Sequence, residues 1–403
     1  MKTCVIIGAG GRGKDAYAAY IKKSGIMKIV AVAEPDKKKL ADFKNEYEIC
    51  DDMCFTDWYD LLSKERLADC AIICTQDRMH VEPAKMAIER GYHIMLEKPI
   101  SPDEEEIKEL KAIVKDYDKT FITGYVLRYT PFIEKIKQLI DSGAIGKIVT
   151  MQLNENEGFW HHAHSYVRGP WANTEQSSPL ILAKSCHDFD LMLYMIGSKC
   201  KSVSSYGSNL FFTPENAPGE VPERCTDGCP FADECKYNAV KLYTEGMGAY
   251  FVHKFECGDS KEQIIKALES NEYGRCIYKC NNDVCDHQVV SLLFENGVTA
   301  VFTVSAFSLE NSRTLKLMGT EGEIGGCLEK GEIVLKHFSD MSEEKFYIAH
   351  DGTKHSGGDS GLIQHFAKLV ESGKPCNDMS VFESHSIAFA AEKSRIEGRQ
   401  IEL

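Results

Sequence analysis

The chain has 403 residues, of which 43% are hydrophobic and 27% are charged, and its formal net charge is −14. This length suffices for two domains with cores of their own, and the negative charge excludes nucleic acid as an expected partner. No apolar run reaches the ~18 residues that a membrane span needs. The first predicted strand starts almost at Met1, so we expect no secretory signal and a cytoplasmic protein whose sixteen cysteines stay reduced.

The first predicted elements are a buried strand over residues 4–7, a glycine-rich turn and a helix over residues 14–23. The turn reads Gly8-Ala-Gly-Gly-Arg-Gly13. A strand, G-x-G-x-x-G and a helix in this order are typical of a dinucleotide site, where the helix start binds the pyrophosphate. An ordinary glycine turn is the alternative interpretation. The residues expected to contact the cofactor here are Gly8, Gly10, Gly11, Arg12 and Gly13.

The second predicted strand, residues 28–33, ends in Glu34, which lies 21 positions after Gly13. A carboxylate at about this distance accepts hydrogen bonds from the adenosine ribose and repels a 2′-phosphate, so the sequence favours NAD over NADP. A solvated carboxylate at the strand end is the alternative. The run Lys37-Lys38-Lys39 could reach a phosphate, but such a run is more often the exposed face of a helix, here over residues 37–47.

The alternation of strands and helices continues to about residue 124. We expect strands over residues 70–74, 92–96 and 120–123, and helices over residues 81–89 and 103–115. This pattern indicates an α/β fold with a doubly wound parallel sheet, a Rossmann domain, over residues 1–125.

The pattern changes after a predicted helix over residues 131–142. Strand-like runs without intervening helices follow at 147–153, 289–294, 298–307 and 314–318, and helices at 361–371 and 381–397 end the chain. We therefore expect residues 126–403 to form an α+β domain with a large open antiparallel sheet. A stretch rich in Pro, Gly and Cys indicates an insertion near residues 214–240.

Two positions carry candidate chemistry for this chain. Lys98, in Glu97-Lys98-Pro99, follows a strand at the edge where open α/β sheets bind ligands, and Pro99 keeps it out of helical geometry. His187 lies near the start of a predicted helix, where it could accept a proton from a substrate hydroxyl. Lys184 and His187 are expected on one helix face. An exposed lysine and a structural histidine are the alternatives.

A predicted loop over residues 155–168 combines aromatic rings with hydrogen-bond donors, which suits a polyhydroxylated ligand. Its candidate substrate contacts are Trp160, His164, Tyr166 and Arg168. Tyr278, in a polar stretch further along, is a weaker candidate of the same kind. The His-x-His pair in the loop could bind metal, but it is more often loop surface.

Cys225, Cys229 and Cys235 lie close together in the predicted insertion. Three cysteines in a turn-rich segment of a reduced protein favour a metal over disulfides, and structural zinc is the first expectation. A fourth ligand could come from Cys257, Cys276, Cys280 or a histidine. An iron–sulfur cluster and thiols without a ligand are the alternatives.

Six motifs in order resemble the Gfo/Idh/MocA family of oxidoreductases, typified by glucose–fructose oxidoreductase and inositol dehydrogenase. The motifs are the glycine turn, Cys74-Thr75-Gln76 with His80, Gly91 through Glu97-Lys98-Pro99, Gly124-Tyr-x-x-Arg128-Tyr129-x-Pro131, Gly143-x-Ile-Gly146 and His187-Asp188-x-Asp190. The resemblance covers nearly the whole chain. It implies an N-terminal Rossmann domain, a C-terminal domain with an open sheet, and a nicotinamide cofactor that reacts with a sugar, cyclitol or related polyol.

The resemblance also implies roles for single residues. Lys98 would bind the substrate and orient the nicotinamide, and His187 would take the hydroxyl proton while hydride leaves the same carbon. The residues implied near the cofactor are Thr75, Gln76, His80, Glu97 and Arg128, and those near the substrate are Tyr129 and Asp188.

One position departs from the family pattern. The family commonly has an aspartate four residues before the histidine, whereas this chain has Ala183 followed by Lys184. The proton acceptor is therefore open, with His187 first and Lys184 or Tyr166 behind it.

The resemblance implies an NAD-dependent dehydrogenase that assembles as a homo-dimer or homo-tetramer. An alternative is a glycosidase that uses bound NAD to oxidise its substrate transiently before elimination. A further alternative is an NAD-binding regulator without catalysis, against which the presence of both Lys98 and His187 argues.

Overall fold

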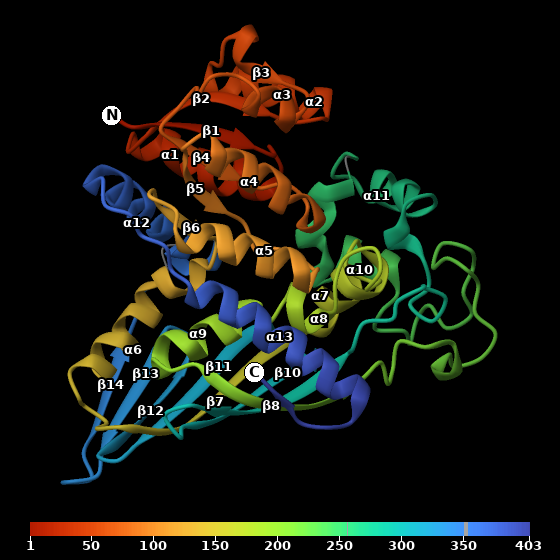
Figure 1. Ribbon diagram of the computed structural model, residues 1–403. Helices are drawn as coiled ribbons and strands as arrows, with labels where there is room; N and C mark the ends of the chain where they lie inside the picture. Colours follow the sequence, from red (N-terminus) through yellow and green to blue (C-terminus); the bar gives the residue numbers. More distant parts are fainter. Residues whose placement is uncertain (256, 350–353) are drawn as a thin grey trace.

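The computed structural model describes residues 1–255, 257–349 and 354–403, and its strands form two sheets (Figure 1). The first sheet is parallel and has the strand order β3-β2-β1-β4-β5-β6. Its strands are β1 (Thr3–Ile7), β2 (Lys28–Ala33), β3 (Cys54–Phe55), β4 (Cys70–Ile73), β5 (His93–Leu96) and β6 (Phe121–Thr123). This is the doubly wound Rossmann sheet that the alternating pattern predicts.

Helices connect these strands, as right-handed crossovers between parallel strands require. They are η1 (Gly11–Ala18), α1 (Ala19–Ser24), α2 (Lys37–Tyr47), η2 (Asp51–Met53), α3 (Trp58–Leu62), η3 (Asp77–Met79), α4 (Val81–Glu89) and α5 (Glu104–Lys115). Asp36 and Asp103 cap α2 and α5 by accepting bonds from backbone N–H groups of the first turn, which fixes where these helices begin.

The second sheet has nine strands in the order β14-β13-β12-β11-β7-β10-β9-β8-β15. All its neighbouring pairs are antiparallel except β7 and β10, which run parallel. The strands are β7 (Ile148–Gly158), β8 (Cys200–Ser208), β9 (His287–Phe294), β10 (Thr299–Ser308), β11 (Ser312–Gly319), β12 (Gly322–Cys327), β13 (Glu332–His337), β14 (Glu343–Tyr347) and β15 (Ile401–Glu402).

Helices cover the face of this sheet that is turned toward the Rossmann sheet, where α6, α9 and α13 lie in Figure 1. The helices of this part are η4 (Val126–Tyr129), α6 (Pro131–Asp141), α7 (Phe159–His162), η5 (Ala163–Arg168), α8 (Leu180–Ala183), α9 (Cys186–Ile196), η9 (Lys354–Gly357), α12 (Gly358–Ser372) and α13 (Ser380–Glu397). Ten of the eleven residues of α9 are buried, so this helix is the centre of the layer between the two sheets.

Two local expectations are wrong. Residues 155–168 are no loop: β7 runs to Gly158, and α7 and η5 continue to Arg168, because this stretch lacks helix-breaking residues and its side chains are mostly buried. Lys184 and His187 do not share a helix, since Lys184 ends α8 and α9 begins at Cys186.

The insertion between β8 and β9 is longer than the expected residues 214–240 and has small cores of its own. Its helices are η6 (Pro214–Asn216), α10 (Ala239–Thr244), η7 (Met247–Phe255), α11 (Lys261–Leu268) and η8 (Glu272–Gly274). It lies beside α7 and α8 (Figure 1). Among the helices of the described residues, none is long and apolar enough to cross a membrane.

Candidate active site at the domain junction

The glycine turn has the geometry that a dinucleotide requires. Gly8 has φ +93°, and a Cβ on it would lie 2.5 Å from the Cys74 carbonyl oxygen. A Cβ on Gly13 would lie 2.0 Å from the Gly8 carbonyl oxygen, whereas a Cβ on Gly10 would meet nothing within 4 Å. Gly10 also precedes η1 without a side-chain cap. The turn therefore leaves open space before uncapped N–H groups of a helix start, where a pyrophosphate fits.

Glu34 lies at the end of β2 beside this turn and is 7% exposed. Its carboxylate accepts hydrogen bonds from the N–H groups of Ala9, at 2.7 Å, and Asp36, at 3.1 Å. Each carboxylate oxygen has further lone pairs for ribose hydroxyls. Its negative charge opposes a 2′-phosphate, which agrees with the expected preference for NAD.

Arg12, in the same turn, is engaged by protein carboxylates. Its Nε donates to Glu97 at 2.7 Å, and its Nη2 lies 2.9 Å from Asp359 in α12. Tyr17 also hydrogen-bonds to Glu97. Glu97 and Arg12, both expected at the cofactor, thus form an ion pair with each other. Together with Asp359 it connects the glycine turn, the end of β5 and the C-terminal domain.

The carboxyl end of β4 lies next to the glycine turn. Thr75 donates its hydroxyl to the Met79 carbonyl at 2.7 Å, and Gln76 is exposed. His80 is buried, with one ring nitrogen 2.7 Å from the Pro99 carbonyl oxygen and the other 3.0 Å from the Thr75 carbonyl oxygen. His80 therefore supports the segment that carries Lys98 and has no ring nitrogen left for a cofactor.

Lys98 reaches from the Rossmann domain to the C-terminal domain. Its ammonium donates to the Ala183 carbonyl oxygen at 3.1 Å, at the position where the family pattern has an aspartate. The next residues are held from the other side, because the Ile100 N–H donates to His385 at 2.8 Å. The Lys98–Pro99 peptide bond is cis.

His187 is the second residue of α9 and is 7% exposed. Burial first, and the charges of Lys98 and Arg313 next, lower the pKa of His187 well below its ordinary value. Its ring packs edge-to-face on Tyr125, with centroids 5.5 Å apart. Within the described part of the chain, His187 Nδ1 has no hydrogen-bond partner. An unpartnered and neutral imidazole beside an ammonium can accept a proton from a bound hydroxyl.

The ammonium of Lys184 is paired with two buried carboxylates. Its ammonium lies 3.2 Å from Glu155 and 3.4 Å from Glu157, which both project from β7. Burial alone would lower the pKa of Lys184, but the two carboxylates raise it above its ordinary value. Lys184 therefore stays protonated, and its geometry does not favour the role of base.

Tyr166 and Asp188 lie near the same charged cluster. Burial first, then Glu157 and Glu155, raise the pKa of Tyr166, so its phenol also stays protonated. Asp188 is fully buried, and its Oδ1 accepts a bond from Arg313 at 2.9 Å, whereas its Oδ2 has no hydrogen-bond partner among the described residues. Of the three expected bases, His187 alone has an environment that favours the neutral, accepting form.

Other expected site residues lie in structural contacts. Arg128 binds Asp190 and Asp378 at 2.5 Å each, and Tyr129 packs against His365 with ring centroids 5.0 Å apart. Both guanidinium edges of Arg128 are thereby used, which leaves it no free fork for a cofactor phosphate.

The candidates from residues 155–168 divide in the same way. Trp160 donates to the Leu309 carbonyl at 3.2 Å, and His164 stacks on Phe251 with ring centroids 3.9 Å apart. Arg168 and Tyr278 line a pocket in the insertion with Cys225, Cys229 and Cys235. His164, Arg168 and Tyr278 thus take part in the packing of the insertion, whereas Trp160 bonds to the turn after β10.

The three cysteines do line one pocket, together with Cys276. However, among the residues that the structure describes, no three Cys, His, Asp or Glu side chains are arranged so that they could hold a metal ion. All sixteen cysteines are free thiols.

Several residues of the site carry no sequence signal of their own. Asp359 and His355 reach Arg12 from more than 340 positions away. Glu155 and Glu157 lie in β7 and Arg313 lies in β11, in strands whose sequences show no motif. The one available hint was the pair of buried-side glutamates in β7, at a spacing of two, which places both on one face of the strand.

Comparisons with known proteins agree with this arrangement. The family model described as "Oxidoreductase family, NAD-binding Rossmann fold" matches residues 2–125, and the GFO/IDH/MocA C-terminal domain model matches residues 133–240. "Putative oxidoreductase YteT" of Bacillus subtilis is 24% identical over 336 residues, which are 80% of this chain and 76% of YteT. The chain spans little more than half of the next two curated relatives.

Two further proteins indicate the range of similar chains. "2,7-anhydro-N-acetylneuraminate hydratase" of Mediterraneibacter gnavus is 24% identical over 291 residues, covering 68% of this chain and 74% of that protein. The solved structure of levoglucosan dehydrogenase with NADH and levoglucosan has a TM-score of 0.72 at 18% identity, over 100% of this chain and 99% of that one, which shows a shared fold. With two family models that together match more than half of its length, the chain belongs to the Gfo/Idh/MocA family of oxidoreductases with an NAD-binding Rossmann fold.

Proposed function

We propose that this protein is an NAD-dependent dehydrogenase that moves hydride between the nicotinamide and a hydroxyl-bearing carbon of a sugar, sugar derivative or cyclitol. One observation carries the proposal. Lys98 bonds to the Ala183 carbonyl, four residues before His187, and burial first and the charge of Lys98 next lower the pKa of His187, which favours its neutral form. NAD, when bound along the carboxyl edge of the Rossmann sheet, supplies the hydride acceptor.

The residues of the chain supply the remaining chemistry. His187 accepts the hydroxyl proton, since its imidazole is neutral and its Nδ1 has no hydrogen-bond partner among the described residues. Lys98 donates to the same oxygen and favours the developing negative charge on it. His80 and His385 hold the Lys98 segment from both sides, so they are positioning residues.

The test is a screen of sugars, sugar acids and cyclitols with NAD and, separately, with NADP, read as formation of the reduced cofactor. We expect turnover with NAD for at least one compound, and its loss in Lys98→Met and His187→Gln with the protein still folded. Reduction of NAD that continues unchanged in both variants would overturn the assignment.

A second candidate is an enzyme that oxidises its substrate transiently and returns the hydride. Two observations support this second candidate: the similarity to a hydratase of an anhydro-sugar, and Ala183 at the position where the family has an aspartate. It predicts loss of substrate without accumulation of NADH. A protein that binds NAD but turns over no compound in either assay is the expected result for a non-catalytic regulator.

We also propose that the molecule assembles as a homo-dimer or homo-tetramer through the open face of the nine-stranded sheet. Tyr206 and Val289 lie opposite each other on β8 and β9, and both are exposed. Sedimentation analysis is expected to give an oligomer that Val289→Glu weakens; a wild-type monomer at micromolar concentration would contradict this.

A further inference from the structure

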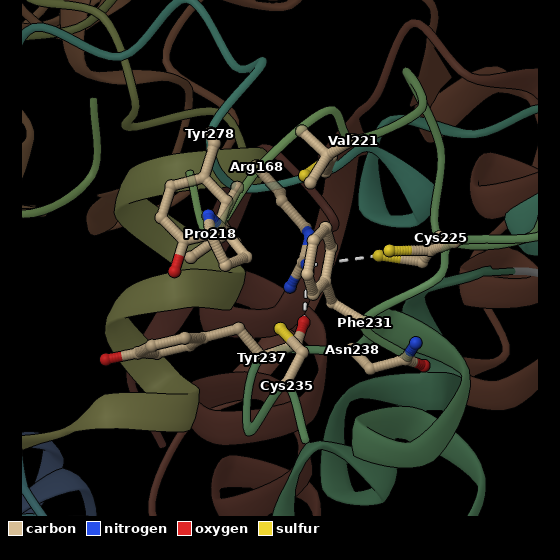
Figure 2. Close-up of a pocket in the computed structure, with 12 residues that line it drawn as sticks. Arg168, Pro218, Val221, Cys225, Phe231, Cys235, Tyr237, Asn238 and Tyr278 are labelled. Atoms are coloured by element: carbon tan, nitrogen blue, oxygen red, sulfur yellow. Dashed lines mark hydrogen bonds between the residues drawn. The ribbon is translucent and has the colours of Figure 1, made fainter. Parts of the chain in front are cut away.

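A pocket in the insertion gathers groups that the proposed hydride transfer does not use. It is lined by Cys225, Cys229, Cys235 and Cys276, by the guanidinium of Arg168, and by aromatic and aliphatic side chains; we call it the cysteine pocket. Figure 2 shows Arg168, Cys225 and Cys235 around it, with the ring of Phe231. The thiols come from two segments of the insertion.

Backbone pairing brings these segments together. Arg224 and Arg275 form an antiparallel bridge, the Cys225 N–H donates to Gly274, and the Cys276 N–H donates to Glu223. Cys225 and Cys276 each follow a bridged residue, so they share the opposite face of this short ladder as diagonal neighbours. The pairing therefore supplies the fourth cysteine that the sequence could not assign: Cys276 lines the pocket with the other three, whereas Cys257 and Cys280 are not among its lining residues.

Arg168 is the second observation that points to a ligand. It is 4% exposed, its Nε donates to the Arg275 carbonyl at 2.8 Å, and its Nη2 donates to the Tyr237 carbonyl at 2.7 Å and lies 3.8 Å from Cys225 Sγ. Its Nη1 has no partner in the part of the chain that the structure describes. None of these partners is a carboxylate. A buried guanidinium without an anion is costly.

A free thiol carries no charge, so an unliganded cysteine does not compensate the guanidinium of Arg168. A divalent metal changes this, because it binds thiolates and displaces their protons. Four thiolates around one divalent ion have a net charge of about −2, which compensates the charge of Arg168.

We propose that the cysteine pocket is a structural metal site that binds one Zn²⁺ through Cys225, Cys229, Cys235 and Cys276, with Arg168 compensating the charge. Binding forms four Zn–S bonds and releases the four thiol protons to solvent. The cavity between the thiols, about 20 Å³, has room for a single water-sized sphere and so for one ion.

The side chains must turn for this to occur, since they are not arranged around a metal as they stand. A cysteine has one side-chain torsion with three staggered positions, and all four thiols already line the same cavity. The bound ion would cross-link residues 225–235 to residue 276. Because Arg168 is the last residue of η5, its contact with the site would also connect the insertion to η5. The inference does not depend on the proposed dehydrogenase activity.

The test uses the full chain, purified under reducing conditions, and metal ions alone as the probe. Elemental analysis is expected to give about one zinc per chain, and Co²⁺ added to the metal-free protein is expected to give the intense thiolate-to-metal absorption of a tetrahedral site. Cys235→Ser and Cys276→Ser should lose this absorption, and Cys257→Ser should keep it. Arg168→Met should retain the spectrum but bind Co²⁺ at least tenfold more weakly.

The wild-type spectrum decides the matter even if a serine variant does not fold. A Co²⁺ titration without thiolate absorption, combined with sixteen reactive thiols in the denatured protein, overturns the proposal. A protein that shows fewer thiols because a disulfide has formed among these cysteines overturns it as well.

Discussion

The proposed role of His187 as a base rests on its surroundings rather than on its place in a motif. Burial disfavours the imidazolium, and the positive charges of Lys98 and Arg313 oppose it further. The pKa of His187 in the folded protein therefore lies below the ordinary histidine value of about 6.5. As pH falls, the accepting form persists until that lowered pKa is reached, so the site tolerates mild acid.

The lowered pKa of His187 predicts how the rate of oxidation depends on pH. We expect kcat/KM to stay level from neutral pH to below pH ~6.5 and to fall only at lower pH. Lys98→Met removes one of the charges that lower the pKa of His187, so that pKa should rise. The residual activity of this variant should therefore begin to fall at a higher pH than the activity of the wild type. Lys98→Arg, which keeps the charge, is the control. An acid limb at the same pH in Lys98→Met and wild type would contradict the electrostatic account.

Glu34 is predicted to decide between the two cofactors. Glu34→Gln removes a charge that accepts two backbone N–H bonds and faces the ribose position. A hydrogen bond to a charged group contributes about 1.5–3 kcal/mol, so NAD affinity should fall about tenfold or more while NADP affinity rises or stays the same. Titration with each cofactor measures this, with the exposed Glu89→Gln as control. An equal loss for NAD and NADP would exclude the repulsion argument.

At the scale of elements, the glycine turn separates packing from ligand binding. Gly13 is in contact with the protein, since a Cβ there would lie 2.0 Å from Gly8, whereas Gly10 faces open space. Gly10 has φ −78°, which any residue adopts. The two glycines of one motif are thus required for different reasons.

Two alanine substitutions should show this difference. Gly13→Ala overpacks the contact between η1 and β1 and should lower the free energy of unfolding by about 1–3 kcal/mol or more. Gly10→Ala should leave the stability within about 0.5 kcal/mol but weaken NAD binding strongly, because its Cβ fills the space that the phosphate approaches. Thermal unfolding and NAD titration measure both; full NAD affinity in Gly10→Ala would place the pyrophosphate elsewhere.

The elements that the sequence predicts well are those with a strong local pattern. The alternation of buried strands with capped helices predicts β2, α2 and α4 with the bounds that the structure has. The edge of the second sheet is different. Strand β12 contains Gly325 and Gly326, and β14 is mostly exposed, so neither has the apolar alternation of a strand and both depend on their neighbours.

The site could be predicted only in part for a related reason. Lys98 and His187 follow recognisable motifs, but the partners that set their chemistry are distant in sequence. Arg128, Trp160 and Arg168 are residue types that suit a ligand equally well, and only the fold shows their protein partners. The division of the chain into residues 1–125 and 126–403 stays a prediction.

For the whole molecule, buried polar contacts hold the segment that follows the Rossmann sheet against helices of the second sheet. Arg128 follows the last strand of the Rossmann sheet and binds Asp190 of α9 and Asp378 before α13. The side chains of Arg128 and Asp190 are 10% and 1% exposed. Removal of a buried partner leaves unpaired charge and typically costs about 3–5 kcal/mol, so this pair should matter for stability although it touches no expected ligand.

Arg128→Met is therefore expected to lower the free energy of unfolding by about 3–5 kcal/mol and to leave the dissociation constant of NAD unchanged in the folded protein. Arg78→Met is the matched control, because Arg78 also bonds to a segment distant in sequence, through the Glu175 carbonyl at 2.8 Å, but at an exposed position; its cost should stay within about 0.5 kcal/mol. Denaturant unfolding and NAD titration give both quantities. If Arg128→Met instead weakens NAD binding without loss of stability, Arg128 contacts the cofactor, as the family resemblance implies, and the segment after the Rossmann sheet is held in place by other contacts.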